Sequence, residues 1–158
     1  MGLEIKTQTT VDATRERVFA YLADFGRHPE WAQPKDQLRI NAPREVRAGA
    51  TFTSIGKDMG RDAKNAVTIT DVAPAERIVY EATMDNGTIW RNAFELADAN
   101  GGTRITRRVS SVSAKFPFNV LLVLLAPMLK GEASKIHVSD LARIKSRLEQ
   151  SAKTEAAR

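Results

Sequence analysis

The sequence predicts an α+β domain in which a curved antiparallel sheet packs against one long C-terminal helix. Three observations predict this fold class. Alternating apolar and polar segments follow one another between residues 3 and 114, the turns between the later segments are too short for parallel crossovers, and apolar residues recur at helical spacing after residue 117. The helix must bury its apolar stripe, and the inner face of the sheet is the surface available for it.

The first elements are a strand and a helix. Residues 3–10 (LEIKTQTT) alternate and are rich in threonine, which favours a strand. Asp12 or Thr14 can cap a helix over 13–23. The following stretch, DFGRHPEW, interrupts the pattern with a glycine and a proline, which predicts a second short helical turn that ends near Trp31.

A run of six further strands follows. The segments are 36–40, 49–57, 63–72, 76–84, 88–96 and 103–114. Turn residues separate the later ones: DNG at 85–87 is the strongest hairpin signal in the chain, and ADANGG supplies another turn. These connections predict antiparallel neighbours.

The final element is a helix over about 117–151. Leu141, Ile144 and Leu148 recur at helical spacing with Lys and Arg between them. Pro127 is expected to kink or break the helix near its first third. The polar residues 152–158 predict a frayed tail, so a single domain is expected to cover 1–151.

The most apolar stretch, residues 116–131 (FPFNVLLVLLAPMLKG), needs a separate explanation. It is shorter than the about twenty apolar residues of a membrane span and is interrupted by Asn119 and Pro127, so no transmembrane segment is predicted. A helix lying on a sheet has an outer face, and the five apolar residues 121–125 cannot all point at the sheet. The stretch is therefore interpreted as a cavity lid, a subunit or membrane contact, or a covered piece of core.

Composition excludes several classes of site. The chain has no cysteine, and its two histidines, His28 and His137, form no HxxxH or HxxE pattern, so no metal site and no cofactor are expected. The net charge is +5, but Lys and Arg are mostly interleaved with Asp and Glu and lack stacking aromatics, which argues against nucleic acid as a partner. The first ten residues lack the apolar core of a secretory signal, so a cytoplasmic location is expected.

Strand alternation separates an inward from an outward set of residues. The apolar phase of 76–84 contains Ile78, Tyr80, Ala82 and Met84. In the other strands the inward phases contain Phe52, Ser54, Asn65, Val67, Ile69, Trp90, Asn92, Phe94, Leu96, Ile105, Arg107, Val109 and Ser111. Asn65, Asn92 and Arg107 are thus polar residues on an apolar face, a texture typical of small-molecule sites.

Three residues are candidates for acid–base or oxyanion chemistry. A buried guanidinium is costly, so Arg107 must meet a carboxylate, water, an anionic ligand, or solvent at the strand end. His137 lies four residues before Leu141, with Asp140 as a candidate partner at i+3, and is interpreted either as a general acid or base or as a partly exposed histidine. Tyr80 is either a second acid or a core residue.

The order of elements and several motifs give the chain a family resemblance. The segments VDATRERVFAYLADFGRHPEW, VAPAERIVYE, GGTRIT and DLARIKSRLEQ resemble the START-like, or Bet v 1-like, helix-grip superfamily (SRPBCC), in particular its bacterial polyketide cyclase/dehydrase and lipid-transport branch. The resemblance covers nearly the whole chain. It implies about seven strands wrapped around the last helix, two short helices after the first strand, and a hydrophobic cavity with His28 and Trp31 near its entrance.

Three functions follow as alternatives. The leading one is binding of a hydrophobic small molecule or lipid between the sheet and the last helix, by a monomer or homodimer. The second is a polyketide cyclase or dehydratase that uses His137, Tyr80 or Arg107, and the third is an interaction module that docks through 116–129. The predicted ligand-binding residues are Trp31, Phe52, Ser54, Asn65, Val67, Tyr80, Met84, Trp90, Asn92, Phe94, Arg107, Val109, Leu121, Leu125, His137 and Leu141.

Overall fold

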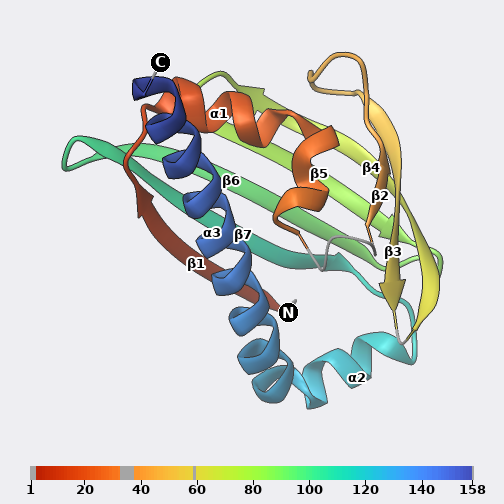
Figure 1. The fold of residues 1–158 in the computed structure, drawn as a ribbon. Coiled ribbons are helices and arrows are strands. Elements are labelled where there is room, and N and C mark those ends of the chain that lie inside the picture. Colours follow the sequence, from red (N-terminus) through yellow and green to blue (C-terminus); the bar gives the residue numbers. More distant parts are fainter. Residues whose placement is uncertain (1–2, 33–37, 59, 158) are drawn as a thin grey trace.

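A computed structural model describes residues 3–32, 38–58 and 60–157 (Figure 1). The elements, in chain order, are β1 (Glu4–Val11), α1 (Arg15–Ala23), the 3-10 helix η1 (Phe25–Glu30), β2 (Arg39–Asn41), β3 (Thr51–Asp58), β4 (Arg61–Ala73), β5 (Arg77–Met84), β6 (Ile89–Ala99), β7 (Gly102–Ser113), α2 (Phe118–Leu124) and α3 (Ala126–Ala156).

The strands form one curved antiparallel sheet. Its order is β1-β7-β6-β5-β4-β3-β2, so the first strand lies beside the last one. Figure 1 shows α1 and α3 lying across the same face of this sheet. The α+β helix-grip architecture with seven strands and a long C-terminal helix is confirmed.

Local sequence signals account for the ends of most elements. Thr14 caps α1 by accepting a hydrogen bond from the Arg17 backbone N–H (3.4 Å). The DNG turn between β5 and β6 closes with a hydrogen bond from the Gly87 N–H to the Met84 carbonyl (2.8 Å), and Gly87 has a φ of +79° that glycine adopts without strain. The strand predicted over 36–40 is observed as β2, although residues 36 and 37 lie outside the described part of the chain.

The C-terminal helix begins and breaks as predicted but ends later. It is split into α2 and α3 at Leu125, and Pro127 lies in the first turn of α3, where its missing N–H costs no hydrogen bond. At the other end α3 continues past residue 151 to Ala156, where a tail was expected. The guanidinium of Arg17 holds this last stretch, with an ion pair to Glu155 (2.9 Å) and a hydrogen bond to Ser151 (3.0 Å).

The core lies between the concave face of the sheet and the helices. Its fully buried side chains include Val18, Leu22, Phe25, Trp31, Ile69, Ile78, Phe94, Ile105, Leu141 and Ile144. The strand phases predicted from alternation are therefore confirmed for the central strands. Leu141, Ile144 and Leu148 form the predicted buried stripe of α3.

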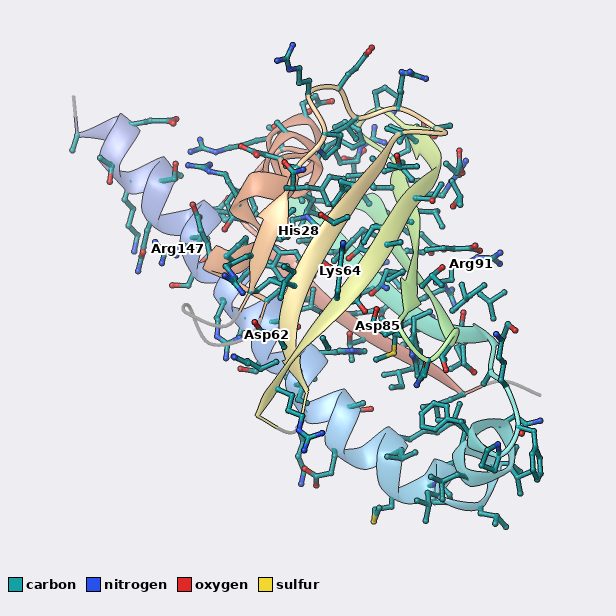
Figure 2. All side chains as sticks on the ribbon, turned by 90° about the vertical axis from the view of Figure 1, so that its right-hand side faces the viewer. His28, Asp62, Lys64, Asp85, Arg91 and Arg147 are labelled. Atoms are coloured by element: carbon teal, nitrogen blue, oxygen red, sulfur yellow. The ribbon has the colours of Figure 1, made fainter. Side chains whose placement is uncertain are left out.

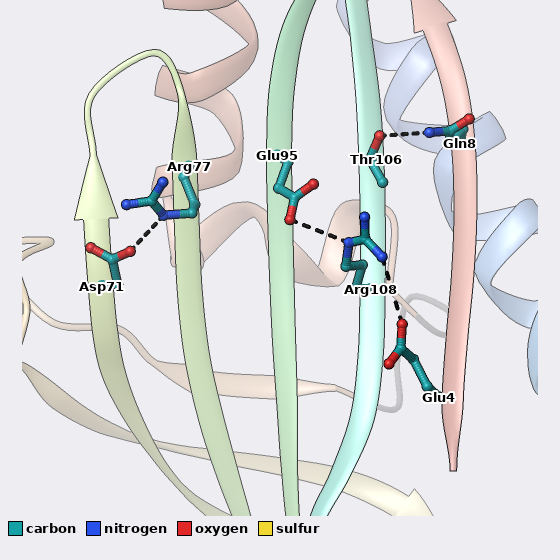
Figure 3. Close-up of polar contacts among 7 residues, drawn as sticks. All are labelled: Glu4, Gln8, Asp71, Arg77, Glu95, Thr106 and Arg108. Carbon is teal, nitrogen blue, oxygen red and sulfur yellow. Dashed lines mark hydrogen bonds and ion pairs between the residues drawn. The ribbon is translucent and has the colours of Figure 1, made fainter. Parts of the chain in front are cut away.

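The convex face of the sheet carries charged residues instead (Figure 3). There the guanidinium of Arg108 on β7 binds Glu95 on β6 (3.2 Å) and Glu4 on β1 (3.6 Å), and Arg77 on β5 binds Asp71 on β4. These pairs are partly solvent-exposed, so they add little stability. They show that the convex face is the solvated one.

Candidate functional site

The candidate site is the concave face of the sheet, which strand register divides into rows. The rows are Thr7–Arg107–Phe94–Ile78, Ile5–Val109–Asn92–Tyr80–Ile69, Ser111–Trp90–Ala82–Val67–Phe52, and Met84–Asn65–Ser54. Each row runs across neighbouring strands, so its side chains are close enough to contact one another.

Burial changes from one end of the concave face to the other. Phe94, Arg107 and Tyr80 are buried beneath the helices, whereas Trp90 and Met84 are only half-buried although they belong to the inward phase. We call the first end closed and the second end open. Inward side chains that solvent still reaches indicate that α3 does not cover the open end.

A hollow of about 380 Å³ lies at this open end. Leu3 of the chain start and Ser111 of β7 line it on the sheet side, and Leu122, Ala126 and Lys130 line it on the side of α2 and α3. Since Ser111 is the register neighbour of Trp90, the hollow adjoins the half-buried row of the concave face.

Arg107 lies at the closed end and is satisfied mainly by a carboxylate, one of the outcomes expected for it. Its Nη1 binds the Asp140 Oδ2 of α3 at 2.7 Å. Its Cζ atom lies 5.4 Å from the centroid of the Trp31 ring and 5.5 Å from that of the Phe94 ring, within range of a cation–π interaction with both. The Nε–H of Arg107 is buried and has no hydrogen-bond partner among the described residues.

A second arginine supports the same carboxylate. The Arg143 Nη1 binds the Asp140 Oδ1 (3.0 Å) and also donates to the Trp31 carbonyl (2.8 Å). Sequence analysis did not identify Arg143, because its helical position is on the polar side of the stripe and carries no signal for a partner in η1.

His137 faces the interior from α3, close to Arg107. Burial first, and the positive charge of Arg107 second, lower the pKa of His137 to about 4. The imidazole is therefore neutral at pH 7, and its Nδ1 is buried without a partner within the described structure. The side chain as a whole is half-buried.

Tyr80 keeps its proton at neutral pH. Burial raises the pKa of its hydroxyl, and the charge of Arg107 opposes this rise while that of Asp140 adds to it. Tyr80 packs edge-on against Phe25 at 5.3 Å between ring centroids. It can thus donate a hydrogen bond but has no means of acting as a base.

His28 and Trp31 lie in the core and not at an entrance as the resemblance implied. His28 is buried, its Nε2–H donates to the Leu22 carbonyl (2.9 Å), and burial lowers its pKa to about 4. Figure 2 shows His28 on the helix side of the strands, whereas Arg91 points away from the sheet on the other side. The difference arises because η1 packs flat against the sheet, with Phe25 and Trp31 on either side of the imidazole (4.4 and 4.7 Å).

The other predicted site residues fall into three groups. Phe52, Val67, Val109 and Leu141 are part of the buried core. Ser54 is buried next to Asn65, whose Oδ1 is buried and lacks a partner in the described residues, and Asn92 is half-buried in the Tyr80 row. On the helix side Leu125 is half-buried, whereas Leu121 is exposed and does not line the concave face.

Thr7 belongs to the site but was not predicted. It is buried beside Arg107, and its hydroxyl has no partner within the described residues. The alternation of β1 is a signal that identifies it, since Thr7 shares a phase with Leu3 and Ile5.

The arrangement suits recognition of a molecule that is apolar over most of its length and carries an acceptor group. Arg107 Nε and His137 Nδ1 face the interior with no partner in the described part of the chain, and the open end offers apolar surface and amide groups. Among the described residues no group of three metal-binding side chains occurs, and no helix there is long and apolar enough to cross a membrane.

Comparison with known proteins agrees with this description. A family model for Activator of Hsp90 ATPase homolog 1-like proteins matches residues 12–117, about two thirds of the chain. No curated protein gives a significant match to the sequence.

Solved structures give the fold. CV1439 from Chromobacterium violaceum is 15% identical, with 92% of this chain and 97% of that chain covered and a TM-score of 0.71. TTHA0849 from Thermus thermophilus is 16% identical, with 94% and 98% covered and a TM-score of 0.70. The di-domain ARO/CYC StfQ from the steffimycin biosynthetic pathway is 15% identical, with 97% and 53% covered and a TM-score of 0.70.

These identities support a shared fold and nothing finer. The family model supports family membership as well, because its match runs from the end of β1 to the residue before α2. The chain belongs to the Activator of Hsp90 ATPase homolog 1-like family, within the SRPBCC superfamily of helix-grip folds.

Proposed function

We propose that the protein binds a hydrophobic small molecule or lipid at the open end of the concave face. The observation that carries this proposal is that Met84, Trp90 and Asn92 face inward yet remain half-buried. Large apolar side chains on the inner face of a sheet are ordinarily covered by the core, so the exposure of Met84 and Trp90 beside Asn92 supports a surface kept free for a ligand. The expected cytoplasmic location is part of this proposal.

The ligand carries a hydrogen-bond acceptor. Its apolar part lies against Trp90, Met84 and Ala82, and its acceptor reaches toward Arg107 Nε and His137. A buried donor without a partner costs free energy, so an acceptor that pairs with it gains more than it would in water. A carbonyl, hydroxyl or carboxylate on an otherwise apolar skeleton meets this requirement.

A polyketide cyclase or dehydratase is the second candidate. The neutral imidazole of His137 next to the cationic Arg107 is the observation that favours it, since the imidazole can accept a proton from carbon next to a carbonyl while the guanidinium stabilises the oxyanion that forms. The fold of StfQ, a di-domain ARO/CYC, is consistent with this chemistry. His137→Asn is expected to abolish turnover in this case while leaving ligand affinity within a few fold.

Two alanines on neighbouring strands provide a matched test. Ala82 faces inward between Trp90 and Val67, whereas Ala93 faces outward between Val79 and Arg108. With an environment-sensitive apolar dye, we expect Ala82→Trp to raise the Kd at least about tenfold, or about 1.4 kcal/mol, because the indole fills the ligand surface. Ala93→Trp is expected to leave the Kd unchanged.

Urea unfolding of both variants shows whether each is folded to the same extent. Equal Kd values for wild type and Ala82→Trp, or equal weakening by both variants, would contradict binding at this surface. Native mass spectrometry of protein purified from its own host then identifies any retained molecule.

A further inference from the structure

The loop before α2, α2 itself and the start of α3 expose a contiguous set of large apolar side chains. We call this set the apolar tip; its members are Phe116, Val120, Leu121, Val123, Leu124 and Met128. Phe116 is 81% exposed and Leu124 is 72% exposed. Single exposed apolar residues are common, but a cluster within so short a segment of the chain is typical of a contact surface.

The apolar tip lies at one end of the molecule. Figures 1 and 2 both show α2 beyond the ends of the strands, next to the start of α3. Within α2 only Leu122 is buried, and it faces the hollow lined by Leu3. Leu122 thus anchors α2 to the body, with Phe118 half-buried and Val123 at the edge of the hollow. Val120, Leu121 and Leu124 are exposed, so the tip is a projection beside the hollow.

The charges of the segment that carries the tip are of one sign. Lys115 precedes it and Lys130 follows it, and no Asp or Glu occurs between residues 99 and 131. The nearest carboxylate further along α3, Glu132, binds Lys135 at 2.8 Å. A surface that receives this tip must therefore accept apolar side chains at its centre and be negative at its rim.

We propose that the apolar tip docks the protein on a bilayer that contains anionic phospholipid. The apolar side chains enter the boundary between headgroups and acyl chains, and Lys115 and Lys130 lie at the level of the headgroups. This inference goes beyond the proposed function and does not depend on it. It adds a consequence, because the hollow under α2 then opens close to the membrane.

The charges disfavour a second copy of the chain as the occupant. Two-fold pairing of the tip brings Lys115 and Lys130 of one copy near the same lysines of the other, and the segment supplies no carboxylate to neutralise them. A projecting tip also suits the soft interior of a bilayer better than another convex surface.

Vesicle co-sedimentation tests the proposal. Full-length protein is mixed with phosphatidylcholine vesicles with or without phosphatidylserine, at low and at high salt. We expect binding to the vesicles with phosphatidylserine, and we expect salt to weaken it. The double variant Lys115→Gln/Lys130→Gln is expected to lose the preference for phosphatidylserine.

Leu124→Asp and Val138→Asp are the matched pair. Val138 is likewise an exposed apolar residue, with 57% of its surface accessible, but it lies ten residues after Met128, about 15 Å further along α3. We expect Leu124→Asp to reduce vesicle binding at least about tenfold and Val138→Asp to leave it within about twofold. Both substitutions are at exposed positions, so both variants are expected to fold.

Three results would overturn the proposal. One is that wild type fails to bind vesicles of either composition, and another is that Leu124→Asp binds as wild type does. The third is a dimer in sedimentation equilibrium that Leu124→Asp dissociates, with no vesicle binding, which assigns the tip to a second copy. The dye assay separates this result from the proposed function, since Leu124→Asp is expected to bind dye normally and Ala82→Trp to bind vesicles normally.

Discussion

Replacing Asp140 with asparagine removes the charge that compensates the buried guanidinium of Arg107. Arg107 is 7% exposed and Asp140 is 3% exposed, and their Nη1 and Oδ2 atoms lie 2.7 Å apart. In Asp140→Asn the guanidinium remains positive but faces a neutral amide. The Trp31 and Phe94 rings that enclose it offer only cation–π attraction in place of the lost carboxylate.

The cost is expected to be large for a single substitution. Breaking a buried ion pair by removing one partner costs roughly 3–5 kcal/mol, because the remaining charge is desolvated and unpaired. Arg143 moderates the loss little, since it is itself a cation that has lost the same partner. The expected decrease is thus a large part of the roughly 5–15 kcal/mol that stabilises an ordinary domain.

Urea unfolding followed by circular dichroism measures this decrease. Asp71→Asn is the matched control, because Asp71 forms an ion pair with Arg77 on the solvated convex face (Figure 3). That variant is expected to unfold at nearly the wild-type urea concentration. The double variant Arg107→Met/Asp140→Leu removes both charges and is expected to recover most of the stability lost in Asp140→Asn.

The double variant also keeps the test valid if Asp140→Asn does not fold at all. Equal urea midpoints for Asp140→Asn and Asp71→Asn would refute the idea that this pair is a buried, tightly compensated one. A double variant less stable than Asp140→Asn would refute the idea that the charges matter more than the shape of the site.

Two further predictions concern pH and glycine. The pKa of buried His28 is about 4 against 6.5 when unfolded, and that of His137 is lowered likewise, so the unfolded chain binds protons at a higher pH than the folded chain does. The stability that these histidines contribute is fully present above about pH 6.5 and is lost as pH falls toward 4, by up to roughly 3 kcal/mol from His28 alone. His28→Gln is expected to flatten this dependence in urea titrations between about pH 4 and 7. A Cβ at Gly102 would lie 2.2 Å from the Val11 carbonyl oxygen, whereas a Cβ at Gly131 in α3 would meet no atom within contact distance. Thermal unfolding is therefore expected to show that Gly102→Ala is destabilised and that Gly131→Ala is stabilised by about 0.5–1 kcal/mol. The reverse order would contradict the packing of β7 against the end of β1.

Much of the concave face was predictable from strand alternation. The phase of β5 put Ile78 and Tyr80 inside, and both are buried. The phase of β7 put Arg107 on the same apolar face, and the cost of a bare buried guanidinium required a partner there. The identity of that partner was not predictable, because Asp140 is 33 residues away on a helix whose rotation depends on packing.

For the apolar stretch at 116–131, in contrast, burial was not predictable from the sequence. Its composition indicated that α2 has more apolar surface than a sheet can cover, and left lid, contact and core open. The structure leaves most of these side chains exposed and buries Leu122, which excludes a fully covered core segment. Periodicity does not tell which of these side chains are covered, since a helix that is apolar on every side has no preferred face.

The sequence by itself determined the local elements: the period of each strand, the DNG turn, the Thr14 cap and the break at Pro127 depend on neighbouring residues only. The tertiary structure decided three things that depend on residues far apart in the chain. These are the Arg107–Asp140 pair, the continuation of α3 to Ala156 through Arg17 and Glu155, and the difference between the closed and open ends of the concave face. The physical reason is that backbone periodicity places a side chain on a face, whereas burial and pairing depend on what the rest of the chain brings to that face.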